Sequence, residues 1–171
     1  GEPMAEETSF RKLDVCDLGY LERAPYRIVS SALLPASAER VFDVLGAPEP
    51  WPQWFPTIKR IENLTDKPFG AGTERDAVTG YGTIREHLLV WERGKRIAFY
   101  VRETDMPALT AFMEDYRLEE VAPGQTQLTW TVVYSLAGWA RLGHPIAKPI
   151  LNKTFADGVS SLEQWLRKNP A

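Results

Sequence analysis

The middle of the chain consists of short segments with strand composition, separated by turn residues at nearly regular intervals. From residue 57 to residue 136, β-branched and aromatic side chains alternate with polar ones, and the turns read DKPFGAG, TGYG, ERGK and APGQ. Consecutive strands with such short connections pair antiparallel. Together with YRIVSSALL ahead of it, the series predicts an antiparallel sheet of six to seven strands. The two GxGT pieces, GAGT and GYGT, are interpreted as hairpin glycines rather than a phosphate loop.

Helical periodicity occurs on both sides of the strand series. In ASAERVFDVL, Ser37 is a suitable N-cap, and Val41, Phe42 and Leu45 share one helical face. Near the C-terminus, six apolar residues follow helical spacing: Ile146, Ile150, Phe155, Val159, Leu162 and Leu166. This order of elements predicts an α+β fold in which a long C-terminal helix covers one face of the sheet.

The length of 171 residues fits one domain, which we expect at residues 25–171 after a polar, partly ordered leader at residues 1–24. The net charge of −3 gives no long-range attraction for nucleic acid or anionic lipid. Basic side chains are dispersed among acidic ones, which also argues against nucleic-acid binding. No apolar run approaches the roughly 20 residues of a membrane span, so no integral membrane association is expected.

The expected compartment is the cytoplasm. The first residues, GEPMAEETSFRKLD, lack the basic-then-apolar pattern of a signal peptide, and the single Cys16 excludes an internal disulfide. Cys16, His87 and His144 show no metal-ligand spacing, so neither a metal nor a cofactor is expected.

The stretch PEPWPQWFP, residues 48–56, combines four prolines with three large aromatic residues. Proline spacing alone would allow a polyproline II ligand for an aromatic groove. Its place between a helix and a strand of one domain favours a rigid elbow with a short second helix. We expect Trp51 to anchor that elbow, and Trp54 and Phe55 to reach the interior.

Three stretches resemble one known family. They are LPASAERVFDVL…PEPWPQWFPTIKRIE, GAGTERDAVTGYGTIREHLLVWERGKRIAF and PGQTQLTWTVVY. In this order they resemble the polyketide cyclase/dehydrase branch of the START and pollen-allergen-like (SRPBCC) superfamily, over residues 26–168. The resemblance implies the helix-grip fold: a curved antiparallel sheet wrapped around a long C-terminal helix, with two short helices after the first strand. It also implies a deep, mostly apolar cavity between sheet and helix.

Two acidic residues fall among the apolar residues that alternation turns inward. Glu86 shares its strand face with Leu88, and Glu114 shares its face with Phe112 and Tyr116. A buried carboxyl without a partner has a raised pKa and can act as a general acid or base, so both are candidate catalytic residues. Three alternatives stay open: an ion pair with Arg75, an ion pair with Arg102, or a bulge that turns the carboxyls outward.

The predicted ligand-binding residues are the large side chains expected to face the cavity. They are Trp54, Phe55, Leu88, Phe99, Phe112, Tyr116, Trp130, Tyr134 and Phe155. The hydroxyls of Tyr116 and Tyr134 could meet a ligand carbonyl or find partners within the core. His87, expected on the opposite and solvated face, and His144, at the start of the long helix, are weaker candidates for catalysis.

Members of the resembling family bind sterols, lipids, polyketides or quinones, some cyclise or dehydrate bound polyketides, and others act through protein contacts. The leading prediction is therefore a monomeric or homodimeric protein that binds a small hydrophobic molecule. One alternative is a polyketide cyclase or dehydratase that uses Glu86 and Glu114. The other is a protein-interaction module, which an exposed apolar patch outside the cavity would favour.

Overall fold

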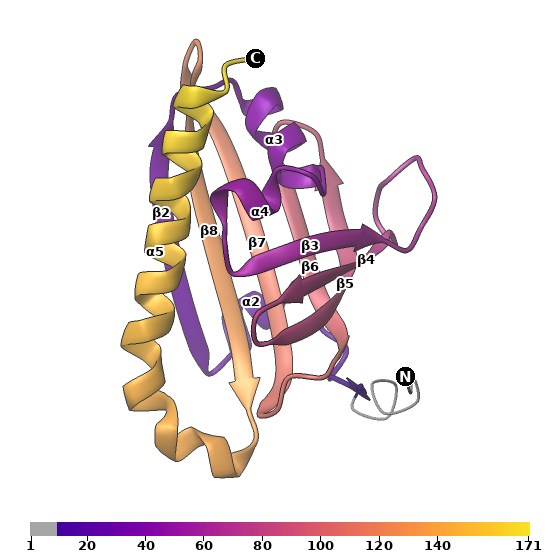
Figure 1. Ribbon diagram of the computed structural model, residues 1–171. Coiled ribbons are helices and arrows are strands. Elements are labelled where there is room, and N and C mark those ends of the chain that lie inside the picture. Colours follow the sequence, from indigo (N-terminus) through magenta and orange to yellow (C-terminus); the bar gives the residue numbers. More distant parts are fainter. Residues whose placement is uncertain (1–9) are drawn as a thin grey trace.

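A computed structural model describes residues 10–171, and residues 1–9 of the predicted leader lie outside the described residues. Seven antiparallel strands form one curved sheet in the order β2-β8-β7-β6-β5-β4-β3, and a short strand, β1, pairs with β6. The strands are β1 (Arg11–Lys12), β2 (Tyr26–Leu34), β3 (Ile58–Asn63), β4 (Glu74–Thr79), β5 (Gly82–Glu92), β6 (Arg96–Thr104), β7 (Leu109–Ala122) and β8 (Gln125–Leu136). Figure 1 shows β3 and β4 curling over the concave side.

One short helix lies against the convex face of the sheet, and the other helices lie on its concave side or beyond its end. The helices are α2 (Tyr20–Arg23), α3 (Ala38–Gly46), α4 (Trp51–Trp54), the 3-10 helix η1 (Gly138–Gly143) and α5 (His144–Lys168). α5 runs alongside β2, and α3 and α4 lie over the sheet beside the C-terminal half of α5 (Figure 1). The predicted order of one strand, two short helices, a meander and a long helix is confirmed. None of the helices in residues 10–171 is long and apolar enough to span a bilayer.

The elbow after α3 forms as the prolines predict. The side chain of Ser37 accepts a hydrogen bond from the Arg40 amide and caps α3. α4 follows as a single turn, and the indole Nε1 of Trp51 donates to the Leu45 carbonyl at 2.9 Å. Because this bond is buried, it fixes the elbow against the end of α3. Trp54 is fully buried, so the elbow is part of the core and not an exposed docking motif.

Only the second half of α5 packs on the sheet as the periodicity predicts. Val159, Leu162 and Leu166 are buried. Ile146 and Ile150, predicted on the same packing face, are 77% and 63% exposed, and that part of the prediction was wrong. Their spacing fits a helix, but in this half of α5 the side that turns to the sheet carries other residues.

The described part of the leader lies against the convex face of the sheet. The Arg11 guanidinium donates to the carbonyls of Leu109 and Met106, both at 2.6 Å. Cys16 and Leu21 are buried in a second, smaller apolar cluster that also contains residues of β6, β7 and β8. The sheet therefore has apolar packing on both faces: a large core on the concave side and a small one under residues 10–24.

Candidate ligand site

The concave face of the sheet carries two acidic residues, as strand alternation predicts. Glu86 on β5 is 3% exposed, and Glu114 on β7 is 6% exposed. Glu114 pairs with Phe99 on β6, and Phe99 pairs with Leu88, two residues from Glu86. Both carboxyls therefore lie within an otherwise apolar face, and their predicted inward orientation is confirmed.

Glu86 has a counter-ion. Arg75 stands opposite it in the ladder, and the Arg75 Nε donates to Glu86 Oε1 at 2.8 Å. A second guanidinium nitrogen donates to the carbonyl of Gly46 at the end of α3, at 3.3 Å. Burial raises the pKa of Glu86, and the charge of Arg75 opposes that rise. Of the two arginines predicted as possible partners of Glu86, Arg75 forms the ion pair, whereas Arg102 binds Glu74 on the opposite face of the sheet. Glu86 is therefore held in a buried ion pair, which makes it a weaker candidate for an acid or base than a carboxyl without a counter-ion.

Among the described residues, Glu114 has hydrogen-bond donors but no counter-ion bonded to it. The Tyr116 hydroxyl donates to Glu114 Oε1 at 2.8 Å, and the Trp130 indole nitrogen donates to the same oxygen at 2.6 Å. Within residues 10–171, Oε2 takes part in no hydrogen bond. Burial, followed by the nearby charge of Glu86, raises the pKa of Glu114 to about 8, against the effect of the two donors. At neutral pH Glu114 is therefore mainly a carboxylic acid, with a proton to donate.

Most of the predicted ligand-binding side chains pack against one another in the main core. Phe112 and Phe155 are half-buried, and the other seven are buried: Trp54, Phe55, Leu88, Phe99, Tyr116, Trp130 and Tyr134. Near α4 the aromatic rings are in close contact, with centroids 4.4 Å apart for Trp51 and Trp54 and 5.7 Å apart for Phe55 and Trp130. This half of the sheet–helix interface is filled by side chains. The Nε1 of Trp54 is buried and has no partner within residues 10–171.

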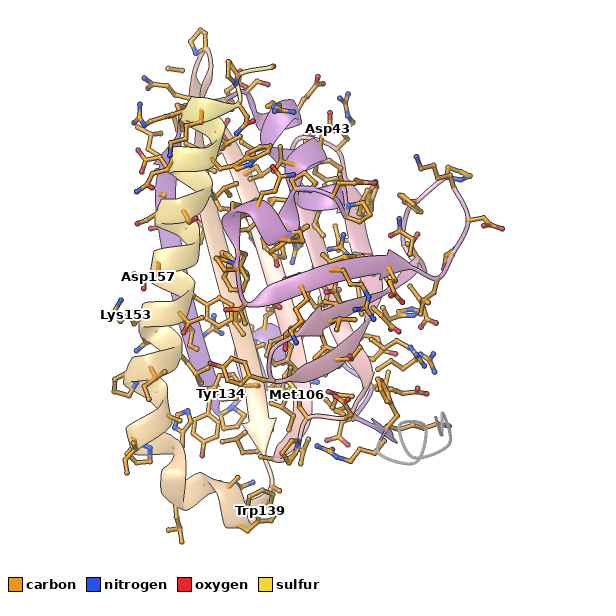
Figure 2. All side chains as sticks on the ribbon, in the orientation of Figure 1. Asp43, Met106, Tyr134, Trp139, Lys153 and Asp157 are labelled. Carbon is orange, nitrogen blue, oxygen red and sulfur yellow. The ribbon has the colours of Figure 1, made fainter. Side chains whose placement is uncertain are left out.

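The other half of the concave face, where α5 begins, is only partly covered. Figure 2 shows Tyr134 and Met106 toward this end of the sheet. Six apolar residues of this end are half-buried: Met106, Leu109, Phe112, Leu136, Leu151 and Phe155. Phe112 pairs with Tyr134 and Glu114 with Val132, so Tyr134 lies one inward position along the sheet from the row that holds Glu114.

A second polar pair lies at this partly covered end. The Tyr134 hydroxyl and His144 Nε2 are 2.6 Å apart, and the ring of Tyr26 lies 3.8 Å from the imidazole, between centroids. Burial, together with the charge of Lys148, lowers the pKa of His144, and burial raises that of Tyr134 to about 12. His144 was only a weaker candidate from the sequence, because nothing in HPIAK indicates that this histidine contacts a tyrosine of β8. His87 instead contacts Glu74, with Nδ1 3.0 Å from Oε2, and is half-buried rather than solvated.

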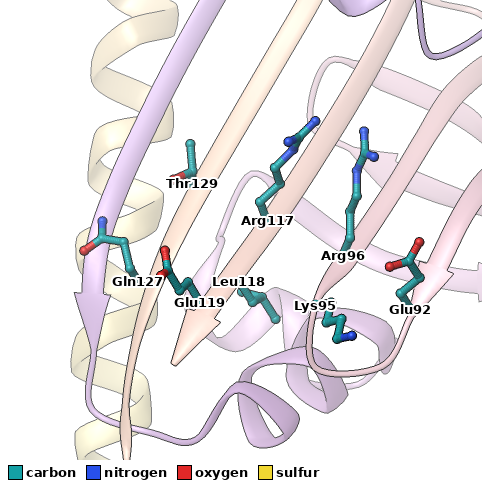
Figure 3. A pocket seen from close by; sticks show the side chains of 8 residues that line it. All are labelled: Glu92, Lys95, Arg96, Arg117, Leu118, Glu119, Gln127 and Thr129. Atoms are coloured by element: carbon teal, nitrogen blue, oxygen red, sulfur yellow. The ribbon is translucent and has the colours of Figure 1, made fainter. Parts of the chain in front are cut away.

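A hollow lies on the convex face of the sheet, away from all of these residues. It measures about 460 Å³ and is shown in Figure 3. Its lining is mostly charged or polar: Glu92, Lys95, Arg96, Arg117, Leu118, Glu119, Gln127 and Thr129. Arg96 and Arg117 both bind Asp115, at 2.8 Å each. Within residues 10–171 no group of three His, Cys, Asp or Glu side chains could hold a metal ion.

Comparison with known proteins agrees with this architecture. Residues 26–167 match the family described as "Polyketide cyclase / dehydrase and lipid transport". The chain belongs to this family. The match begins at β2 and ends one residue before the end of α5, so it includes every strand and helix that forms the concave face. The family and fold support a ligand-binding or polyketide cyclase-like role for this member.

One relative is the Mycobacterium tuberculosis (strain ATCC 25618 / H37Rv) protein named "Uncharacterized protein Rv2574". It is 38% identical over 149 residues, which are 86% of this chain and 89% of the relative. Among solved structures, a START superfamily protein from Mycobacterium smegmatis superposes with a TM-score of 0.71 at 17% identity, covering 83% of this chain and 97% of that one. The Zhui aromatase/cyclase from Streptomyces sp. R1128 also gives 0.71, at 14% identity, covering 85% and 96%. At such low identity these structures establish the helix-grip fold alone.

Proposed function

We propose that this family member binds one small, largely apolar molecule with a carbonyl or hydroxyl group, between the concave face and α5. The observation that carries the proposal is the Glu114 carboxyl, which is 6% exposed and lies within an otherwise apolar face. Tyr116 and Trp130 hold its Oε1, and its Oε2 has no partner within residues 10–171. A ligand oxygen that accepts a hydrogen bond from this carboxyl would gain a polar contact inside an otherwise apolar face. Apolar sites with a few such polar groups are typical of small-molecule binding.

The route to Glu114 would run through the partly covered end of the concave face. Phe112 on β7 and Phe155 on α5 are half-buried there, and the ring of Phe155 lies 5.2 Å from that of Trp130, between centroids. Because the first half of α5 has few buried side chains, it can move at lower cost than the second half. Displacement of Phe155 would give a ligand access to the row of Trp130 and Glu114.

Titration with three probes tests this function: a long-chain fatty acid, a naphthoquinone and a hydroxyanthraquinone. We expect quenching or a shift of tryptophan emission that saturates at one molecule per chain. Glu114→Gln retains a donor and should keep the affinity, whereas Glu114→Met should weaken it about tenfold or more. Glu119→Gln, on the exposed side of the same strand, is the matched control. Circular dichroism verifies that each variant is folded.

The pH dependence of binding adds an independent readout. Affinity of the wild type should fall as the pH rises through about 8, because ionisation removes the proton that Glu114 donates. Glu114→Gln should show no such fall. If none of the three probes gives saturable binding, or if wild type and Glu114→Gln respond identically to pH, the interior does not bind ligands through Glu114.

A second candidate function is catalysis of the polyketide cyclase type, and the raised pKa of Glu114 favours it. A general acid works best when its pKa lies near the working pH. The attacking carbon of the ligand would give its proton to water, and Glu114 would transfer its own proton to the carbonyl oxygen as the new carbon–carbon bond forms. The Glu114 carboxylate would then regain a proton from water. With an identified substrate, Glu114→Gln should still bind but lose turnover. Unchanged turnover in Glu114→Gln and Glu86→Gln would remove both residues from the mechanism.

A further inference from the structure

A row of large apolar side chains on η1 and the first half of α5 has no partner within residues 10–171. Trp139 is 71% exposed, Leu142 89%, Ile146 77% and Ile150 63%. Ile146 and Ile150 are four residues apart and lie on one side of α5. Trp139 and Leu142 are three residues apart, one turn of η1, which leads directly into α5. Figure 2 shows Trp139 beyond the end of the sheet. The four side chains expose on the order of 500 Å², as much as the largest apolar patch of a typical monomer.

This row is separate from the side of α5 that faces the sheet. His144 is buried against Tyr134, and Leu151 and Phe155 are half-buried against the main core. A helix that serves only the core of its own domain needs one apolar stripe. The first half of α5 has two, and the second, with Ile146 and Ile150, faces away from the core. The exposed stripe therefore indicates a partner outside the domain.

Basic side chains accompany the exposed row. Residues 138–152 contain Arg141 and Lys148 and no acidic residue, and both basic side chains are exposed. Neither forms an ion pair within residues 10–171. Lys153, the next basic residue, is paired with Asp157 at 2.6 Å. This end of the molecule is thus locally positive although the whole chain carries a net charge of −3.

We propose that Trp139, Leu142, Ile146 and Ile150, together with Arg141 and Lys148, form a surface that docks on an anionic lipid bilayer. Helical segments with large apolar side chains on one side and cations beside them bind in the plane of the bilayer interface. A second copy of the chain fits less well, because a symmetric contact would bring the basic residues of both copies together. The docked surface adjoins the partly covered end of the concave face. The proposal does not depend on which molecule the interior binds.

Vesicle co-sedimentation tests the proposal, with vesicles of equal parts phosphatidylglycerol and phosphatidylcholine compared with pure phosphatidylcholine. The wild type should bind the anionic vesicles, bind more weakly as salt rises, and show a blue shift of the emission from Trp139. The shift should disappear in Trp139→Phe. Leu142→Ser with Ile146→Ser should reduce the affinity about tenfold or more. The matched control, Leu64→Ser with Val121→Ser, removes exposed apolar side chains elsewhere and should bind like the wild type.

The substituted residues are exposed, so the variants should fold, and their thermal unfolding is compared with that of the wild type. Arg141→Glu with Lys148→Glu provides a second test, which should abolish the preference for anionic vesicles. Three results would overturn the proposal. They are failure of the wild type to bind anionic vesicles, equal binding by the apolar and control variants, and a concentration-dependent dimer that Leu142→Ser with Ile146→Ser dissociates. The last result would assign the surface to a second copy of the chain.

Discussion

Replacement of Glu114 by glutamine tests whether this residue is a neutral acid inside the folded protein. The amide has the shape of the protonated carboxyl, and its oxygen can accept the bonds that Tyr116 and Trp130 now donate to Oε1. The variant therefore keeps the packing and the two hydrogen bonds. What it loses is the ability to ionise.

The expected effect follows from the difference between the folded and unfolded pKa of Glu114. Its pKa rises from 4.5 to about 8 on burial. A raised pKa means that the folded state holds the proton more tightly, so the stabilisation is fully present below pH 4.5 and is lost as the pH rises through about 8. Each pH unit between these values removes about 1.4 kcal/mol. Between about pH 5.5 and about pH 7.5, the wild type should lose about 2–3 kcal/mol of unfolding free energy relative to Glu114→Gln.

Urea unfolding at several pH values measures this quantity. The comparison is between wild type and Glu114→Gln, since other groups titrate equally in both and cancel in the difference. Glu119→Gln, exposed on the same strand, should track the wild type. A difference between wild type and Glu114→Gln that stays constant from about pH 5.5 to about pH 7.5 would refute the protonated state and, with it, the donor role of Glu114.

Two further changes test the packing around the site. Arg75→Met should destabilise the protein by about 3–5 kcal/mol, because it leaves Glu86 buried without a counter-ion, and Arg75→Met with Glu86→Met should recover most of that loss in urea unfolding. A single variant no less stable than the double would contradict the buried pair. Gly158→Ala places a Cβ against the ring of Phe55 and should reduce the unfolding free energy by about 1–3 kcal/mol, measured as a lower melting temperature. Gly143→Ala is the control, because its added Cβ meets no atom within 4 Å, and its melting temperature should equal or slightly exceed that of the wild type. If Gly158→Ala melts at the same temperature as the wild type, the ring of Phe55 moves aside at little cost.

Local patterns correctly predicted several parts of the site. Alternation along two strands turned Glu86 and Glu114 inward, because successive side chains of a strand point to opposite faces whatever the strand pairs with. The GYGT segment forms the hairpin between β4 and β5, where Gly82 has a φ of +141°. Trp51 anchors the elbow through a residue only six positions away. Each of these outcomes depends on neighbours in the sequence.

Contacts between distant segments could not be predicted in the same way. From the sequence, either Arg75 or Arg102 could have been the partner of Glu86. Arg75 is the partner because the register of β4 against β5 places it opposite Glu86. Arg102 binds Glu74 on the other face of the sheet. Ile146 and Ile150 have the right period for a packed helix face. Whether such a face meets the sheet depends on how α5 lies against β2, which helical spacing does not specify.

The sequence by itself determined the order of the elements, the family and the inward position of two acids, because short-range periodicity and turn chemistry encode these features. The tertiary structure decided that those two acids differ. Glu86 received a guanidinium from the neighbouring strand, and Glu114 received two neutral donors and a buried position. The charge state of a carboxyl depends on its depth and on the groups that folding brings within a few ångströms. That environment exists only once the sheet has formed.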